Sequence, residues 1–490
     1  MNYIKISLAY FSLMCFSNTQ SQNFHNLNFE QTCDTSKTGL CYWDLLWGDK
    51  NAVKQDIING AKCLLIQGSK VTSVGFTEQA SSITSSKDIQ ILTVSATFQT
   101  KDIEGKGAGL NISLYDKDEQ LVATKDMGGF YSIDWIKGTN DWNEYSISLV
   151  CPMNAIKMKV GAILYGKGKA WVKNYKVTLK SIAGRKANKL AKKYITPACD
   201  TISKNSLLRD SIDIKSLKEI ALKIAGSAKK YSDCYLAINY LLESLRPYGD
   251  HHSFFMKADE VVNWENNGSS VSKIEYPSYR VIKDCGYILV PPFHGGNQNL
   301  MVAYADSLQQ AIKKMENLGI KGWIIDLRQN TGGNMEPMIA GLGPLFSSSK
   351  LGSLVDVNNK AEAWYYKDGK YFGDGYLGWS VSSPVTVSSK LPIAVLTSNQ
   401  TGSSGEIVTI SFIGNARTKS FGQPTWGLTT GNGSFNLSDG SRMFLASTIM
   451  ADRNGRQYTS SIKPDVQIDN MLVDNVDMVL TAAIDWIKSY

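Results

Sequence analysis

Residues 391–414 read LPIAVLTSNQTGSSGEIVTISFIG, an apolar run, a turn of small residues and a second apolar run. The first run is typical of a buried strand and the second of a helix, so the stretch predicts a strand, a turn and a helix. Ser403 and Ser404 lie in the turn, where free N–H groups at a helix start would stabilise an oxyanion. On its own, however, the turn favours a simple helix cap at Ser403, with Glu406 three residues on.

Strands and helices alternate on both sides of this stretch, over residues 263–490, which predicts an α/β core with partly parallel strands. Residues 183–262 carry apolar side chains at helical spacing and predict a helical segment. Residues 23–182 contain short alternating runs separated by Gly, Asn and Asp, which predicts a β-sandwich. Because 490 residues are too many for one ordinary core, a multidomain chain is expected.

The N-terminus reads MNYIKISLAYFSLMCFSNTQSQ, with an early lysine, an apolar segment and then small polar residues. This pattern predicts a signal peptide over residues 1–22 and an exported protein, periplasmic or extracellular. Cys15 offers a lipoprotein anchor as the alternative, but Met14 stands where a small residue is expected, so we favour the signal peptide. No later stretch reaches the roughly 18 apolar residues of a membrane span, so we expect no transmembrane segment.

Composition narrows the function classes. The net charge is +8, but Lys and Arg are scattered, which argues against a nucleic-acid partner. An exported chain permits disulfides, and Cys33 and Cys41 are close enough in sequence to pair, although buried free thiols explain the eight cysteines equally well. No Cys or His pair has zinc-ligand spacing, so we expect no metal and no cofactor.

A serine nucleophile needs a base, and imidazole is the usual one. The chain has four histidines: His25, His251, His252 and His294. Two of them lie in RPYGDHHSFF, residues 246–255, where a polar cluster ends the helical segment. This clustering makes His251 and His252 stronger candidates than a lone surface histidine.

A second turn is rich in glycine. The stretch IIDLRQNTGGN, residues 324–334, is an apolar strand followed by Gly332 and Gly333. Paired glycines let backbone N–H groups approach a ligand closely, which suits an oxyanion hole. A plain strand-to-helix turn explains the same pattern equally well.

Together these segments resemble one peptidase family, which includes the C-terminal processing (tail-specific) proteases, the tricorn core protease and the nisin-resistance protein. The resemblance covers about residues 185–490. It rests on motifs in the family's order: D-x-H-S at 250–253, D-L-R-x-N-x-G-G at 326–333, S-x-x-E at 403–406, GQPT at 422–425, DGS at 439–441 and IKPD at 462–465.

The resemblance implies a ClpP/crotonase-like α/β core and a serine nucleophile. The family's nucleophile precedes the glutamate by three residues, which selects Ser403 and leaves Glu406 in a supporting role. Ser404 would then give a backbone N–H to the oxyanion hole, and Gly332 or Gly333 would give the other.

Departures from the family pattern decide the expected base. The Ser–Lys branch has a lysine shortly after G-x-P-T, but Leu428 stands there, so that dyad is excluded in its usual form. The tricorn-like branch uses a glutamate shortly before I-x-P-D, where this chain has Tyr458. A Ser–His dyad with His252, as in the nisin-resistance-like branch, fits best, and Asp250 would support it. The gap from His252 to Asp326 is also too short for a PDZ insertion.

The expected function is therefore a serine endopeptidase, similar to carboxyl-terminal processing proteases, acting on a peptide or protein. The alternative is a catalytically inactive homologue that binds a peptide or a glycan. Residues 138–179 resemble the end of a galactose-binding-like β-sandwich (jelly roll) of carbohydrate-binding modules. Trp142, Tyr145 and Trp171 are candidates for sugar stacking, but we favour core packing for them and leave a glycan partner open.

Overall fold

The computed structural model describes residues 24–48, 52–83, 88–128, 134–267, 274–387, 390–469, 471–473 and 475–490. The predicted signal peptide and Cys15 lie outside these ranges. The chain divides into two compact units, which meet in sequence between Arg185 and Lys186. None of the helices within the described ranges is long and apolar enough to cross a membrane.

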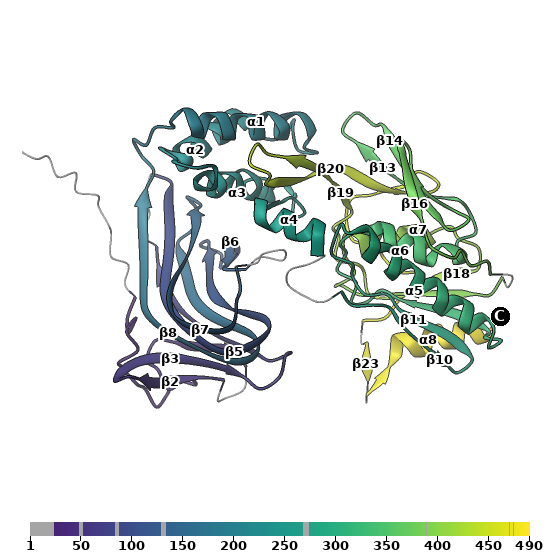
Figure 1. Cartoon of the computed structure of the whole chain (residues 1–490), viewed down its shortest axis with the longest axis horizontal. Helices are drawn as coiled ribbons and strands as arrows, with labels where there is room; N and C mark the ends of the chain where they lie inside the picture. Colours follow the sequence, from purple (N-terminus) through teal and green to yellow (C-terminus); the bar gives the residue numbers. More distant parts are fainter. Residues whose placement is uncertain are drawn as a thin grey trace, which may run out of the picture. The chain divides into compact units, whose positions relative to one another are not determined.

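The N-terminal unit is rich in strands, which hydrogen-bond into one sheet of eight (Figure 1). The order β1-β4-β8-β3-β2 forms its main path, and β5 pairs with β8, β7 and β6. Alternating side chains of these strands form a buried apolar core. The strands are β1 Asp44–Trp47, β2 Val53–Ile58, β3 Ala61–Gly68, β4 Val74–Ser82, β5 Gln90–Tyr115, β6 Leu121–Asp126, β7 Ile136–Cys151 and β8 Lys157–Ser181.

Two of these strands are unusually long and curved. The glycines that suggested turns in the sequence lie inside β5 and β8. The register shifts between Gly105 and Gly107 of β5, and Gly105 pairs with Gly166 across the two strands. Both have positive φ, and a Cβ on Gly166 would lie 1.9 Å from Glu104 O, so only glycine fits there. The ladder therefore continues through the bend where separate short strands were expected. The galactose-binding-like sandwich stays a prediction.

The aromatic side chains considered for sugar stacking are half-buried and have partners inside this unit. Trp171 Nε1 donates to Asp56 Oδ2 at 2.8 Å, and Tyr145 packs edge-on against Phe98. The Lys173 ammonium lies 3.9 Å from the centre of the Trp142 ring. The three rings are therefore packed against side chains of their own unit without being fully buried, and a glycan partner stays a prediction.

Cys33 and Cys41 form a disulfide, as the sequence allowed, with their Cα atoms 4.9 Å apart. The other described cysteines are buried free thiols, and they are Cys63, Cys151, Cys199, Cys234 and Cys285.

The second unit begins with helices. Two tyrosines of these helices, Tyr194 and Tyr235, donate hydrogen bonds of 2.9 and 2.7 Å to Asp439. Asp439 lies at the tip of the hairpin formed by β19 (Thr430–Asn436) and β20 (Arg442–Asp452). The helical segment therefore anchors the far end of this hairpin. The helices are α1 Lys189–Asn205, α2 Ile214–Ala225, α3 Tyr235–Glu243 and α4 Ala258–Asn267, with short 3₁₀ turns at Tyr231–Cys234 and Arg246–Tyr248.

The α/β core is built on a six-stranded sheet with the order β10-β11-β12-β17-β18-β22. All neighbours are parallel except β10 and β11, so the carboxyl ends of the central strands share one edge. The strands are β10 Ser278–Ile282, β11 Cys285–Leu289, β12 Gly322–Asp326, β17 Ile393–Thr397, β18 Thr418–Gly422 and β22 Val466–Gln467.

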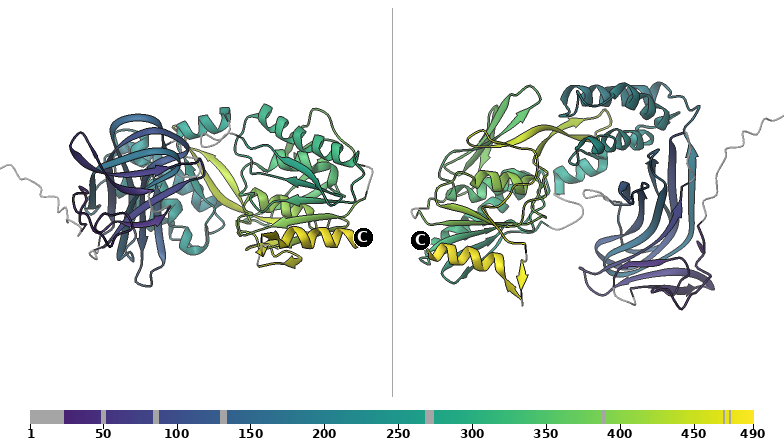
Figure 2. Two further views of the ribbon diagram at one scale, coloured as in Figure 1. Left: turned by 90° about the horizontal axis from the view of Figure 1, so that it is seen from below. Right: turned by 180° about the vertical axis from the view of Figure 1, so that it is seen from behind.

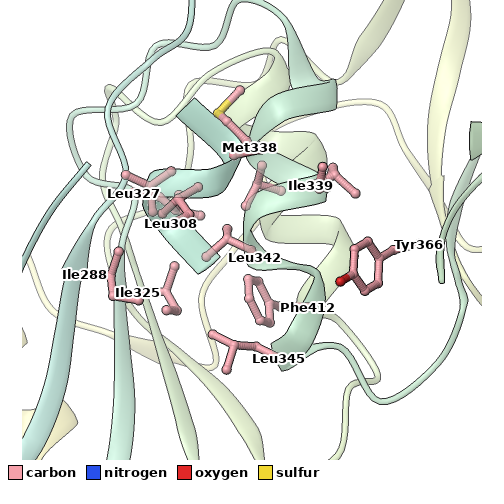
Figure 3. Packing of buried hydrophobic residues seen from close by; sticks show 14 of the residues in the cluster. Ile288, Leu308, Ile325, Leu327, Met338, Ile339, Leu342, Leu345, Tyr366 and Phe412 are labelled. Carbon is pink, nitrogen blue, oxygen red and sulfur yellow. The ribbon is translucent and has the colours of Figure 1, made fainter. Parts of the chain in front are cut away.

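Helices cover both faces of this sheet, as the apolar strand sequences require. On one face, Ile288 and Ile325 of the sheet pack with side chains of α5 Gln298–Glu316, α6 Met335–Leu342 and α7 Ser404–Phe412 (Figure 3). A 3₁₀ turn, Gly343–Leu345, extends α6. On the other face, α8 Met478–Lys488 packs on β12, β17 and β18 (Figure 2).

A second sheet supplies the hairpin that carries part of the site. Its order is β16-β15-β14-β13-β20-β19, and the short strands β9 and β21 also pair with β20. The strands are β9 Phe254–Met256, β13 Lys350–Asp356, β14 Ala361–Lys367, β15 Lys370–Gly373, β16 Tyr376–Ser380, β19 Thr430–Asn436, β20 Arg442–Asp452 and β21 Gln457–Tyr458. A separate pair, β23 Leu472–Val473 and β24 Val476–Asp477, precedes α8.

Candidate active site

The turn between β17 and α7 presents Ser403 directly before the first residue of the helix. Ser403 has φ 53° and ψ −118°, a backbone conformation that non-glycine residues rarely adopt. The buried Glu406 carboxylate holds this geometry, because its Oε2 accepts a hydrogen bond of 2.9 Å from Ser403 N–H. Burial raises the pKa of Glu406, against the opposing effect of its hydrogen-bond donors.

The nucleophile turn is bound to the glycine turn that follows β12. Thr401 Oγ1 donates to Leu327 O at 2.8 Å, and Gly402 N–H donates to Asn330 O at 3.0 Å. Ser404 Oγ donates to Gly333 O at 2.6 Å. The two turns extend from neighbouring parallel strands, so the sheet brings them together.

The two glycines of this turn play different parts. Gly332 N–H donates to Asn330 Oδ1 at 3.0 Å, and a Cβ on Gly332 would lie 2.7 Å from Ser403 Cβ. Among the hydrogen bonds of the described residues, none has the N–H of Gly333 or of Ser404 as its donor. The N–H groups of Gly333 and Ser404 therefore have no acceptor among the described residues, as donors to an oxyanion require.

A loop before β9 brings a histidine to this turn. The Asp250 carboxylate accepts hydrogen bonds from the N–H groups of His252 and Ser253, at 3.0 and 2.9 Å, and from Ser253 Oγ. The strand that follows pairs with β20, with Phe254 opposite Phe444. Asn432 on β19 also donates to His252 O at 3.0 Å. The Asp250 side chain thus fixes the loop by binding the backbone N–H groups of His252 and Ser253, and it makes no hydrogen bond with the imidazole.

The imidazole joins two residues that are far apart in sequence. His252 Nε2 lies 2.9 Å from Ser403 Oγ, and Nδ1 lies 2.8 Å from Thr430 Oγ1 at the start of β19. If Nε2 accepts the serine hydrogen, Nδ1 carries its own hydrogen and donates it to Thr430. Burial lowers the pKa of His252 to about 4, although the Asp250 charge opposes this, so the ring is neutral at pH 7.

The structure thus brings together Ser403, Ser404, His252, Gly332 and Gly333, with Glu406 and Asp250 as supports. Three residues of the site, Thr430, Asn330 and Asn432, were not predicted from the sequence. Thr430 and Asn432 carry no local signal, because their roles depend on the pairing of β19 and β9 with β20. Asn330 lies inside the glycine motif, so its position was visible but its contact was not.

The remaining histidines and Tyr458 make no hydrogen bond to Ser403 among those of the described residues. His251 is exposed, and His25 belongs to the N-terminal unit. His294 is close to Gly333, since a Cβ there would lie 2.8 Å from His294 Nδ1, and burial lowers the pKa of His294 to about 4. Tyr458 donates to Asp452. Within the described ranges, no three His, Cys, Asp or Glu side chains are arranged to hold a metal ion.

The chain is similar in sequence and in structure to known proteins. Residues 284–468 match the profile of peptidase family S41, and the chain therefore carries a peptidase family S41 domain. The nisin-resistance protein of Lactococcus lactis subsp. lactis is 29% identical over 298 residues, which are 61% of this chain and 87% of that protein. The structure of a lipoprotein from Streptococcus agalactiae is 26% identical, with a TM-score of 0.51, covering 62% of this chain and 97% of that one.

Proposed function

We propose that the chain is an exported serine peptidase that cleaves peptide bonds through an acyl-enzyme, with Ser403 as nucleophile and His252 as base. The observation that carries this proposal is the 2.9 Å separation of His252 Nε2 and Ser403 Oγ. The peptidase S41 domain supports the reaction class. A partly buried, neutral imidazole in hydrogen-bond contact with a serine hydroxyl is suited to accept its proton.

The reaction follows from the positions of these groups. Ser403 Oγ attacks the substrate carbonyl carbon while its proton passes to His252 Nε2. The C–N bond then breaks, and the imidazolium returns the proton to the leaving amine. Water, deprotonated by the same imidazole, attacks the acyl-enzyme and releases Ser403 and a carboxylic acid.

The N–H groups of Gly333 and Ser404 would bind the oxyanion of both tetrahedral intermediates. The hydrogen bond from Ser404 Oγ to Gly333 O ties these two donors to each other. Such preorganised donors are effective because they need no rearrangement as charge develops, and losing one costs roughly 100- to 1000-fold in rate.

A fluorophosphonate probe tests the proposal, because it labels an activated serine without needing the natural substrate. The wild-type protein should be labelled, and Ser403→Ala and His252→Ala should abolish labelling. Ser203→Ala is the control, since it removes an exposed hydroxyl on α1 that bonds only within its own helix and lies outside the candidate site. Labelling that survives Ser403→Ala would refute the proposed nucleophile.

The alternative, an inactive homologue that binds peptides, predicts a folded wild-type protein that the probe does not label. Export is proposed from the N-terminal sequence, and mass spectrometry of the mature N-terminus in a secreting host tests it. Cleavage near residue 22 would support the signal peptide. Acylation at Cys15 would favour the lipoprotein route, which the similar Streptococcus agalactiae lipoprotein keeps open.

A further inference from the structure

A loop between β18 and β19 places two apolar side chains beside the nucleophile. Trp426 N–H donates to Thr401 O at 2.8 Å, which aligns the loop with the nucleophile turn. A Cβ on Gly402 would lie 3.3 Å from Trp426 Cε3 and 3.7 Å from Leu428 Cδ1. Because Gly402 directly precedes Ser403, both side chains lie within one residue of the reacting serine.

The backbone of this loop is fixed although the Trp426 side chain is exposed. Glu406 Oε1 accepts hydrogen bonds from Thr425 Oγ1 at 2.6 Å and from Gly427 N–H at 2.9 Å. The indole is nevertheless 56% exposed, and Leu428 is half-buried. A large aromatic side chain that is held in place but left open to solvent is typical of a binding surface.

We propose that Trp426 and Leu428 form the wall of an apolar subsite for a substrate side chain next to the scissile bond; this inference rests on the proposed peptidase function. The substrate carbonyl carbon must approach Ser403 Oγ to about 3 Å, and the two Cα atoms that flank the scissile bond are only about 3.8 Å apart. A flanking side chain therefore reaches the surface that covers Gly402.

The chemistry of this surface selects for an apolar partner. Glu406 is the acidic group that holds the loop, but it is fully buried and its oxygens are taken up by Ser403, Thr425 and Gly427. The surface offered by the loop is thus an indole and an aliphatic side chain. A Leu, Met, Phe or Tyr side chain would bury apolar area against it, while a charged side chain would lose hydration without gaining a partner.

A peptide library prepared from a digested proteome tests the subsite, with cut positions read by mass spectrometry on the full-length protein. The wild-type protein should favour a large apolar residue at one position flanking the cut. Trp426→Ala should lower kcat/KM for such peptides by roughly 10- to 100-fold relative to a peptide with alanine there. Trp426→Glu should shift the preference at the same position towards Lys and Arg.

Leu318→Ala is the matched control, because Leu318 is 70% exposed and precedes β12, at the opposite edge of the sheet from Ser403. It should leave the cut preference unchanged. Fluorophosphonate labelling separates the two levels of inference. An unlabelled wild type overturns the peptidase function itself. Normal labelling of Trp426→Ala with unchanged cut positions, or loss of labelling in this variant, overturns the subsite alone.

Discussion

The two halves of the candidate site are held by different kinds of structure. The nucleophile half lies between neighbouring parallel strands, and side chains of its own two turns fix it through short hydrogen bonds. The histidine half comes from a loop 151 residues upstream and is fixed by a hairpin of another sheet. The proposed nucleophile and oxyanion donors therefore form a local unit, whereas the proposed base depends on contacts between distant segments.

The largest effect is expected from Gly332→Ala, which changes the nucleophile half. A Cβ there would lie 2.7 Å from Ser403 Cβ and 2.8 Å from Gly402 O, at a φ of 108°. Displacing the nucleophile from the oxyanion donors should cost at least about 100-fold in kcat. Gly319→Ala is the control, because its φ is also positive but no atom lies within 4 Å. Equal activity losses in both variants would show that backbone strain alone is responsible.

Glu406→Gln should come next, with a loss in both kcat and stability. Both Glu406 oxygens accept hydrogen bonds from N–H or O–H groups, and glutamine replaces one of these oxygens with an NH₂ group, which cannot accept. One buried donor then loses its acceptor, which lowers the free energy of unfolding by about 1–3 kcal/mol. Thermal unfolding and peptide hydrolysis measure the two effects. Glu336→Gln is the matched control, because burial also raises the pKa of the Glu336 carboxyl group. If it loses as much activity, the Glu406 network has no special role.

Thr430→Val isolates the histidine half. It keeps the shape of the side chain but removes the partner of His252 Nδ1, so the imidazole loses its orientation and preferred tautomer. We expect kcat to fall by up to roughly 100-fold with little change in KM. Thr430→Ser should restore most of the activity, since it returns the hydroxyl. Full activity in the valine variant would mean that the loop alone orients the ring.

Asp439→Asn tests the far end of the same hairpin. The substitution weakens the acceptor for Tyr194 and Tyr235, so the free energy of unfolding should fall by about 1–3 kcal/mol. Activity should fall less than in Thr430→Val, because β9 and β19 still hold the loop through β20. If the folded variant loses as much activity as Thr430→Val, then the hydrogen bonds at the hairpin tip are needed to position His252.

The smallest effect is expected from mild acid. Since the pKa of His252 is about 4, the ring stays neutral at pH 5.5, and kcat/KM should fall there by less than about a tenth from its value at pH 7. With an ordinary histidine pKa near 6.5, kcat/KM would fall about eightfold over the same range. The acid limb of a pH profile on a peptide substrate decides between them.

More of the nucleophile half than of the histidine half could be predicted from the sequence. The turns around Gly332 and Ser403 each follow an apolar strand, so local patterns located both. The choice between Gly332 and Gly333 needed the structure, because it depends on the Asn330 side chain. The role of Thr430 depends on strand pairing across a large sequence separation, which one sequence does not reveal. In the N-terminal unit, glycines paired across two strands looked like turns because their partners were unknown.

Glu406 has a consequence for protein engineering. One carboxylate receives both the nucleophile's backbone N–H and the donors of the Trp426 loop. A designer who transplants a foreign loop here to alter selectivity must retain the hydroxyl at position 425 and the amide at 427. Otherwise the loop exchange displaces Glu406 and, with it, the backbone of Ser403. Libraries that randomise only positions 426 and 428 keep the two donors at positions 425 and 427 and so leave Glu406 in place.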